Sequence, residues 1–248
     1  MTCFNRHLVT RLRTRLGLPL MGHRDFQRMV AGQRGLEIGG PSEYFVKRLP
    51  IYEVALAVDQ INFSATTVWS EAANAGPFGV VPALSSGRAF VCDATELRPI
   101  ADAQYDFVLS CHNLEHIANP LKALTEWTRV IRSGGHLLLI VPNKAGNFDH
   151  CRPDTTFEHL LEDQLRGMDE GDLSHLDEIL SLHDLGRDPG AGDATGFKAR
   201  SMLNFENRCL HHHVFSLALA CHVVRHCGFE VVCHATTPAE FIVAGCKK

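Results

Sequence analysis

Three acidic residues, Glu37, Asp59 and Asp93, stand at or near the ends of short apolar runs of the chain. A short apolar run bounded by turn residues predicts a buried strand. The carboxyl ends of parallel strands share one edge of a sheet, and ligands bind at that edge. We therefore expect the three carboxylates to face one ligand. An acid after the second strand is placed to accept hydrogen bonds from ribose hydroxyls, so the pattern predicts a nucleoside-type cofactor site.

A turn rich in glycine follows the first of these runs. It consists of Gly39, Gly40, Pro41 and Ser42. Neither glycine nor proline favours continuation of a strand, and a turn without Cβ atoms lets a ligand approach the backbone closely. We expect these four residues to lie against the cofactor.

Strand-like runs alternate with helical patterns from residue 34 to residue 142. This alternation predicts an α/β fold with a parallel sheet and right-handed crossovers. The link between the last two runs, Thr236 to Pro238, is too short for a crossover helix, so those two strands must pair antiparallel. The expected strands are 36–38, 54–59, 88–93, 105–111, 136–141, 229–234 and 240–246.

Two helices of this core have recognisable ends. Asn119 is a good cap and Pro120 suits the first turn of the helix after the fourth strand, and we expect that helix to stop at Ser133-Gly134-Gly135. A helix over 214–227 is expected to stop at Gly228.

Residues 144–213 interrupt the alternation with leucine repeats, many histidines and a Gly-rich loop. We interpret them as a helical insertion. Because it follows the fifth strand, it should lie over the same sheet edge as the cofactor and act as a substrate lid. The remaining segments, 31–143 and 214–248, would form the cofactor-binding domain.

Apolar side chains recur every four residues from Phe4 to Leu16, which predicts an amphipathic helix. We interpret residues 1–30 as a helical cap over the sheet or the cofactor cleft, with an Arg-rich transit peptide or anion-binding surface as the alternative. Residues 61–87 predict a long connection with at most a short helix.

The composition narrows the classes of partner. A chain of 248 residues, 45% of them hydrophobic, predicts one globular domain with a sizeable core. A formal charge of −4 does not favour binding to nucleic acid. Nine scattered cysteines favour reduced thiols and a cytoplasmic location, and no apolar run has the length of a membrane span.

These motifs together resemble the class I S-adenosylmethionine-dependent methyltransferases, especially the small-molecule type. The resemblance covers roughly residues 34–142 and rests on Leu36 to Gly39, on Asp59, on Cys92 to Ala94, on Ser110 to Ile117, and on the acid and Arg-Val pattern of residues 126–135. It implies a Rossmann-like sheet of seven strands, mostly parallel with an antiparallel last strand, and helices on both faces. It also implies S-adenosyl-L-methionine as cofactor and a small-molecule acceptor.

The resemblance further implies roles for single residues. Glu37 and the first glycines would lie against the methionine portion, Asp59 would hold the ribose, and Asp93 would meet the adenine amino group. Pro41 and Glu43 replace glycines that the family usually has, which leaves the contacts of residues 41–44 open. The implied cofactor set is Glu37, Gly39, Gly40, Pro41, Ser42, Asp59, Cys92, Asp93, Ala94, Ser110, Cys111 and His112.

Three other functions compete with this one. A dinucleotide-binding dehydrogenase needs a three-glycine pattern that the chain lacks, and carboxylates near a diphosphate would repel it. A non-catalytic S-adenosylmethionine sensor or scaffold stays open as the alternative function. Methylation of RNA or protein is disfavoured by the acidic balance and by Ser110 to Asn113, which stand where a Pro-Pro-aromatic motif would be expected.

A hydroxyl or ammonium acceptor must lose a proton, and histidine is the usual base near neutral pH. We expect that base to be His116, just after the fourth strand; His150, beside Asp149, is second, and His212 in the run 211–213 is third. The chain has 15 histidines, so most of them must have other roles.

The sequence leaves metal binding and oligomeric state open. Acids and histidines in 149–154 and 211–213 offer ligands, but no spacing matches a closed metal motif. Arg152 and Arg200 are candidates to pair with an anionic group of the substrate, or to hold the lid in place.

Overall fold

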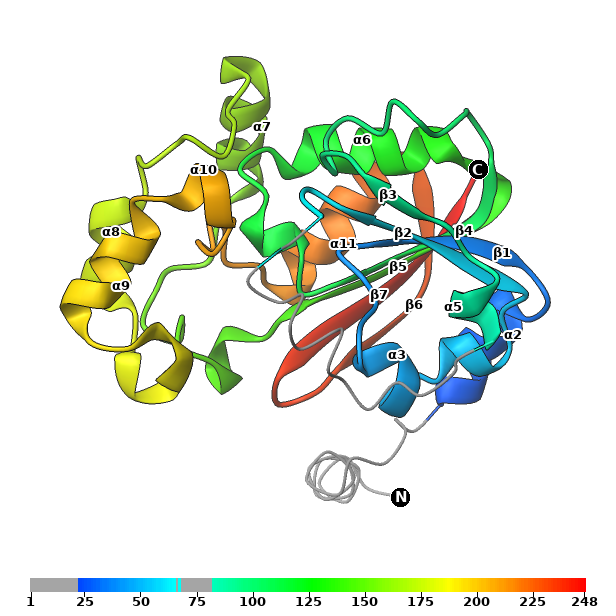
Figure 1. The fold of residues 1–248 in the computed structure, drawn as a ribbon, viewed down its shortest axis with the longest axis horizontal. Coiled ribbons are helices and arrows are strands. Elements are labelled where there is room, and N and C mark those ends of the chain that lie inside the picture. Colours follow the sequence, from blue (N-terminus) through cyan, green and yellow to red (C-terminus); the bar gives the residue numbers. More distant parts are fainter. Residues whose placement is uncertain (1–21, 66, 68–81) are drawn as a thin grey trace.

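The computed structural model describes residues 22–65, 67 and 82–248 (Figure 1). Seven strands form one sheet in the order β3-β2-β1-β4-β5-β7-β6. β7 pairs antiparallel with both neighbours and the other pairings are parallel, which confirms the expected fold class. The strands are β1 (Arg34–Ile38), β2 (Ala57–Asn62), β3 (Ala89–Val91), β4 (Tyr105–Cys111), β5 (Ile131–Pro142), β6 (Phe229–Thr236) and β7 (Glu240–Lys247).

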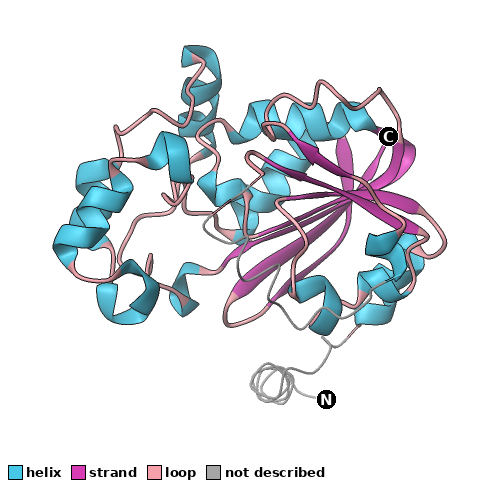
Figure 2. Cartoon of the chain, viewed as in Figure 1, coloured by secondary structure: helices cyan, strands magenta, loops and turns pink. Residues whose placement is uncertain are grey.

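Helices cover both faces of this sheet (Figure 2). One face packs against α6 (Pro120–Val130), α7 (Phe157–Arg166) and α11 (Leu217–His226). The other packs against α2 (His23–Val30), α3 (Tyr44–Lys47), α5 (Pro82–Ser85) and the 3₁₀ turn η1 (Ile51–Glu53). The central strands are therefore apolar on both sides, as expected for a covered parallel sheet.

Alternation along the strands decides which face each side chain joins. In β1, Leu36 and Ile38 pack with α6 and α11 in the first apolar cluster. Glu37, between them, must point to the opposite face, because successive side chains of a strand alternate. In β4, Val108 joins the first cluster, and Phe107 and Leu109 join the second.

The expected end of α6 is wrong. Its start is as expected, since the Asn119 side chain accepts a hydrogen bond from the Lys122 amide at 3.1 Å. The helix stops at Val130, however, and β5 begins directly at Ile131. Ser133-Gly134-Gly135 lies within β5, where the ladder with β4 shifts register and Gly134 takes a φ of 71°.

The expected end of the second strand is also wrong. β2 runs to Asn62, three residues beyond Asp59, because its ladder with β1 continues from Asp59 through Ile61 and β3 pairs along its other side. The sequence prediction stopped at the first acid. A polar residue can stand within a strand that is paired on both sides, so an acid by itself does not mark the end of a strand.

The insertion is helical, as expected, and its elements lie beyond the carboxyl ends of the parallel strands (Figure 1). Ile179, Ala191, Phe197 and Leu210 form a small apolar cluster of its own. Its elements are η3 (Lys144–Gly146), α7, α8 (Leu176–Leu182), η4 (Leu185–Arg187), η5 (Pro189–Ala191), α9 (Ala194–Ser201) and α10 (Asn204–Asn207), and a segment without helix or strand then leads to α11.

Some expectations fall outside the described residues. The amphipathic helix expected between Phe4 and Leu16 lies outside the described residues. Most of the expected connection over 61–87 also lies outside them, at residues 66 and 68–81. The described end of that connection carries the short helix α5. The eight cysteines within the described part are all free. No described helix is both long and apolar enough to cross a membrane.

Candidate functional site

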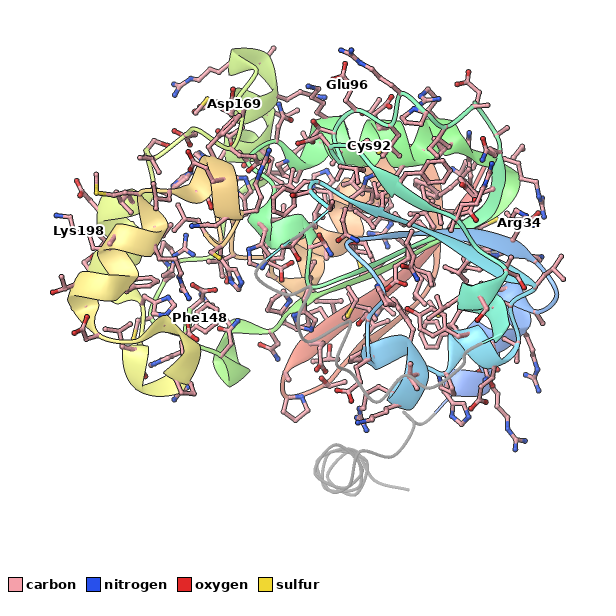
Figure 3. All side chains as sticks on the ribbon, viewed as in Figure 1. Arg34, Cys92, Glu96, Phe148, Asp169 and Lys198 are labelled. Carbon is pink, nitrogen blue, oxygen red and sulfur yellow. The ribbon has the colours of Figure 1, made fainter. Side chains whose placement is uncertain are left out.

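A cavity of about 290 Å³ lies at the carboxyl edge of the sheet, and we call it the sheet-edge cavity. Eight of the expected cofactor residues line it. Figure 3 labels Cys92, which lies at the carboxyl edge of the sheet, and Arg34, which begins β1 at the amino end. The eight are Gly39, Pro41, Ser42, Cys92, Asp93, Ala94, Cys111 and His112.

The turn after β1 needs glycine for a steric reason. Gly39 has a φ of 70°, and a Cβ built there would stand 2.1 Å from Asn113 Nδ2. Asn113 occupies that space because its Nδ2 donates to the Ile38 carbonyl at 2.9 Å. The β4 turn thus holds the end of β1 in place, and Asn113 itself lines the sheet-edge cavity.

Glu37 lies beneath the turn and is not among the described residues that line the sheet-edge cavity. Its carboxylate accepts hydrogen bonds from the Tyr52 hydroxyl and, at 2.9 Å, from the Ser42 amide. Burial raises the pKa of Glu37 to about 7, although both hydrogen bonds act to lower it. Gly40 covers it closely, since a Cβ there would stand 2.3 Å from Glu37 Cδ. Glu37 therefore shapes the turn from below.

The structure places Asp59 away from the ligand edge. It is fully buried and accepts hydrogen bonds from Tyr105 Oη at 2.7 Å and from the Arg88 amide at 2.8 Å, and Arg34 Nη1 lies 3.5 Å away. Since Arg34 begins β1, this carboxylate faces the amino half of the sheet. The residue at the actual tip of β2 is Asn62, which lines the sheet-edge cavity.

Asn62 and Asp93 are the polar groups at the ends of β2 and β3. Asn62 Nδ2 donates to the Gly40 carbonyl at 2.9 Å and so connects the β2 tip to the turn. Asp93 Oδ1 accepts from the amide and the hydroxyl of Thr95, each at 2.8 Å. Ser110, also expected here, is fully buried, and the described cavity lining does not include it.

The insertion contributes two charged residues to the sheet-edge cavity, Glu170 and Arg208. Arg208 Nη2 lies 3.3 Å from Asp93 Oδ2, and its Nη1 lies 3.2 Å from Glu170 Oε1. The guanidinium also stands 5.3 Å from the ring centre of Phe63. Neither residue is predicted from the sequence, because they come close to β3 only through the folding of the insertion.

A second cavity, of about 540 Å³, lies within the insertion, and we call it the insertion cavity. His116 lines both cavities, so it stands between them. Figure 3 labels Phe148, a wall residue on the insertion side. The cavity is lined by His116, Phe148, Asp149, Arg152, Ile179, His183, Asp188, Gly190, Phe197, Arg200, Cys209, Leu210 and His211.

One histidine of this cavity is oriented by a carboxylate. His211 Nδ1 lies 2.5 Å from Asp149 Oδ2, and Asp149 also accepts from Arg152 Nη1 at 3.0 Å. Burial by itself would lower the pKa of His211, but the bond to Asp149 and its charge raise it above its usual range. Burial would raise the pKa of Asp149, and His211 and Arg152 instead bring it down to about 2. Asp149 is ionised and holds the His211 ring.

His116 and Glu115 lie beside this pair. His116 Nδ1 lies 3.0 Å from the Leu210 carbonyl, and its ring centre is 4.5 Å from that of His211. Glu115 is buried, and neither of its carboxylate oxygens accepts a hydrogen bond from any described residue. Burial raises the pKa of Glu115 to about 7. One nitrogen or oxygen from each of Glu115, His116 and His211 lies within 4.8 Å of the others.

With this geometry in view, the comparisons decide the family. Residues 36–139 match the family described as "Methyltransferase domain". The matched residues form a methyltransferase domain, and the seven-stranded sheet has the fold expected of class I S-adenosylmethionine-dependent methyltransferases. No curated protein matches the methyltransferase in sequence.

Solved structures share its fold at low identity. An S-adenosylmethionine-dependent methyltransferase from Aquifex aeolicus is 13% identical, with 95% of this chain and 93% of that one covered and a TM-score of 0.52. One from Mesorhizobium loti is 14% identical, with coverages of 91% and 96% and a TM-score of 0.53. One from Methanosarcina mazei is 14% identical, with coverages of 93% and 99% and a TM-score of 0.50.

The sheet-edge cavity fits the cofactor of this family. S-adenosylmethionine carries a cationic sulfonium and an ammonium group, and the cavity lining includes the carboxylates of Asp93 and Glu170. The turn at Gly39 offers backbone without a Cβ, which allows a ligand close approach. The only described cation in the lining, Arg208, is already paired with both carboxylates.

Two histidines expected to act as bases lie elsewhere in the methyltransferase. His150 Nε2 pairs with Asp184 Oδ2 at 2.9 Å, and the residue is absent from the described lining of either cavity. His212 is buried, with Nε2 2.9 Å from Asn204 Nδ2 and 3.4 Å from Glu170 Oε2, and it too is absent from both described linings. Its neighbour His211, not His212, lines the insertion cavity.

The two arginines expected in the lid differ in what they bind. Arg152 is 2% exposed and is held by Asp149, by Glu178 at 2.9 Å, and by the His211 carbonyl at 2.8 Å. It therefore holds the insertion in place. Arg200 also lines the cavity, and its Nη2 lies 3.7 Å from Asp188 Oδ2. Its Nε is buried, and the described residues provide no hydrogen-bond partner for it.

Proposed function

We propose that the methyltransferase transfers the methyl group to an oxygen or nitrogen of a small molecule bound in the insertion cavity, with residues 144–213 acting as the substrate lid. The observation that carries the proposal is that His116 lines both cavities. A donor in the sheet-edge cavity and an acceptor in the insertion cavity would therefore meet beside this residue. A cavity of about 540 Å³ is in the range of small-molecule sites.

The proposed cofactor site uses the residues at the tips of the strands. The methionine portion would lie against the turn at Gly39, the ribose near Asn62 and the adenine near Asp93. Asn62 replaces Asp59 in this assignment, because Asn62 stands at the end of β2 in the cavity lining and Asp59 is bound to Tyr105 and Arg88. An amide can hydrogen-bond ribose hydroxyls as donor or acceptor.

The proposed base is His211, with His116 next to it as a positioning residue. When bound, S-adenosylmethionine would supply the methyl group: its sulfur–methyl bond would break with the electron pair going to sulfur, and the acceptor oxygen or nitrogen would form the new bond to carbon. The acceptor proton passes to His211 Nε2, because Nδ1 donates to the ionised Asp149. Methyl transfer is a displacement on an already activated carbon, so most of the acceleration comes from alignment, with the base adding a smaller factor.

The cavity walls favour an acceptor with an anionic group. Arg200 lines this cavity, and its guanidinium lies 3.7 Å from Asp188 Oδ2, beyond hydrogen-bond distance. A carboxylate or phosphate on the acceptor would satisfy it. Phe148 and Phe197 line the same cavity and would contact the apolar part of such a molecule.

The proposal is tested by separating cofactor binding from turnover. Calorimetry measures affinity for S-adenosylmethionine and for its demethylated product, and a screen of anionic hydroxy and amino compounds identifies the acceptor. His211→Asn should keep the cofactor Kd within about threefold and lower kcat by about 10²–10⁴. His150→Asn, a histidine outside both described linings, is the matched control and should keep kcat.

Two outcomes contradict the proposal. Unchanged kcat in His211→Asn removes the base assignment. Cofactor binding without methylation of any compound in the screen removes the small-molecule acceptor and favours the sensor or scaffold alternative.

A further inference from the structure

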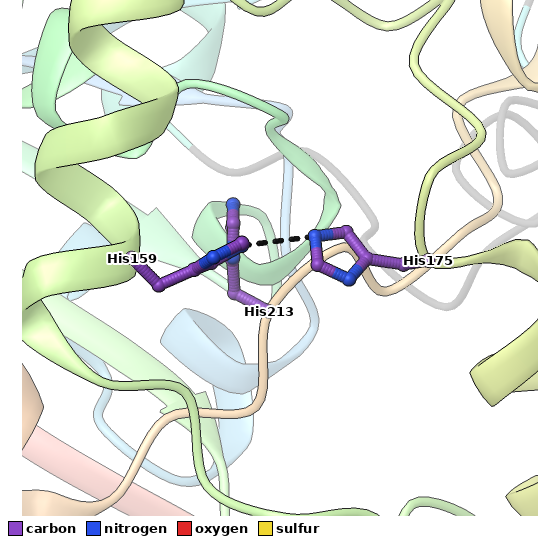
Figure 4. A group of neighbouring side chains, drawn as sticks. All are labelled: His159, His175 and His213. Atoms are coloured by element: carbon purple, nitrogen blue, oxygen red, sulfur yellow. Dashed lines mark hydrogen bonds between the residues drawn. The ribbon is translucent and has the colours of Figure 1, made fainter.

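A group of three histidines lies apart from both described cavity linings, where the insertion meets the sheet domain (Figure 4). They come from separate segments: His159 from α7, His175 from just before α8, and His213 from the segment that leads to α11. One ring nitrogen from each lies within 4.8 Å of the others. His159 Nε2 and His175 Nε2 are 3.0 Å apart, as the dashed line in Figure 4 shows.

A buried carboxylate stands beside them. Asp163 follows His159 by one turn of α7, and its side chain is 5% exposed. Its Oδ2 lies 3.3 Å from His159 Nε2 and 3.7 Å from His213 Nε2. By hydrogen-bond geometry this oxygen has no partner among the described residues. An acceptor left unsatisfied in the interior is costly, and a bound cation would remove that cost.

Three separations within this group are close to those of a metal coordination shell. Zinc binds histidine nitrogen at about 2.0–2.1 Å in a tetrahedron, so neighbouring ligand atoms are about 3.3 Å apart. The 3.0 Å, 3.3 Å and 3.7 Å separations of this group lie on both sides of that value.

We propose that His159, His175 and His213 bind one zinc ion, with the Asp163 carboxylate beside them as the oxygen ligand. Three imidazoles favour zinc, copper, nickel or iron over magnesium or calcium, and a closed site of four protein ligands is typical of structural zinc. The site would tie together three segments of the insertion that are distant in sequence.

The rival interpretation is a hydrogen-bonded cluster without metal. In that case one of His159 and His175 donates to the other, and His213 Nε2 donates to the Ala118 carbonyl at 3.2 Å. This arrangement satisfies the histidine pair but leaves Asp163 Oδ2 unsatisfied in the interior. A zinc ion accounts for the carboxylate as well, which is why the geometry favours the metal.

The proposed zinc site would also act on the sheet-edge cavity. Glu170 lies between α7 and His175 in the chain, accepts from the Ala118 amide at 3.2 Å and pairs with Arg208 in that cavity. Zinc at His175 would therefore fix the loop that carries Glu170. We expect loss of zinc to lower the thermal stability of the chain and to weaken cofactor binding.

The experiment measures zinc directly. Chelator-treated full-length protein is titrated with zinc against a chromophoric indicator, and bound metal is counted by elemental analysis. The expected result is one zinc per chain. His175→Ala should weaken zinc binding about 100-fold or more, because one of three nitrogen ligands is lost. Asp163→Asn should weaken it less. His234→Ala, which removes an exposed histidine of β6, is the matched control and should bind as the wild type does.

Cobalt offers a second measurement that does not depend on the fold surviving a mutation. Cobalt added to the chelator-treated wild type should give the visible absorption of a tetrahedral nitrogen site, and zinc should displace it. No zinc bound by the wild type overturns the proposal, as does wild-type affinity in folded His175→Ala. Neither measurement needs cofactor or acceptor, so the result stands apart from the proposed methyl transfer.

Discussion

The sheet-edge cavity and the insertion cavity share His116, but different forces place their walls. The first is built from strand ends, where the ladders of β1, β2 and β4 fix the turn at Gly39 through main-chain hydrogen bonds. The second is built from buried charges in the insertion. There Arg152, 2% exposed, links Asp149, Glu178 and the His211 carbonyl.

This difference predicts how each cavity responds to change. A sheet of parallel strands tolerates most surface substitutions. A substitution that places a new Cβ against packed atoms disrupts it. A buried ion network tolerates changes of volume, but removal of one partner leaves an uncompensated charge. The sheet-edge cavity should thus be sensitive to sterics and the insertion cavity to charge. Four predictions test the contrast, from the largest expected effect to the smallest.

Removing the charge at the centre of the insertion should have the largest effect. Arg152→Leu removes the guanidinium that pairs with Asp149 and Glu178, and a broken buried pair costs about 3–5 kcal/mol. We expect the free energy of unfolding, measured by urea titration, to fall by about that amount. Arg187→Leu, which removes an exposed arginine of the same insertion, is the control. Equal stability of the two variants would contradict the role of Arg152.

Adding one methyl group to the turn should come next. Gly39→Ala forces a Cβ against Asn113 at a φ of 70°, so we expect the cofactor Kd to rise about 100-fold, equivalent to about 2.7 kcal/mol. Gly196→Ala in α9, where the new Cβ meets only Asp193 Oδ1 at 3.4 Å, should leave Kd unchanged. Calorimetry measures both, and wild-type affinity in Gly39→Ala would refute the steric argument.

The tip and the interior of β2 should separate binding from stability. Asn62→Ala should raise the cofactor Kd about tenfold, since one hydrogen bond to the ribose and one to the turn are lost. Asp59→Asn should keep the Kd and lower the free energy of unfolding by about 1–3 kcal/mol, because Arg88 and Arg34 lose their carboxylate. The reverse pattern would restore the original ribose assignment to Asp59.

The smallest expected effect is a shift in pH dependence. His211 acts as a base only when it is deprotonated, so kcat/KM should fall as the pH drops through its pKa, which Asp149 raises. Asp149→Asn removes that charge and should move the acid limb of the profile to lower pH. The measurement is a pH profile of kcat/KM with the identified acceptor. An unmoved acid limb would show that another group controls it.

Most of the core could be predicted from the sequence, because its signals are local. An apolar run such as Tyr105 to Cys111 predicts a strand whatever lies beside it, and β4 has those bounds. Asn119 before Pro120 marked the start of α6, and the short link at Thr236 to Pro238 required the antiparallel hairpin of β6 and β7. Eight of the twelve expected cofactor residues line the sheet-edge cavity for the same reason.

What the sequence alone determined is therefore the sheet, its glycine turn and the edge at which a ligand binds. The tertiary structure decided which side chains line the two cavities. Three consecutive histidines show this best: His211 faces the insertion cavity, His212 binds Glu170, and His213 joins His159 and His175. No local pattern distinguishes them, since each partner is far away in the chain. A strand or turn depends on neighbours in sequence, whereas the partner of a buried charge is chosen only when distant segments pack together.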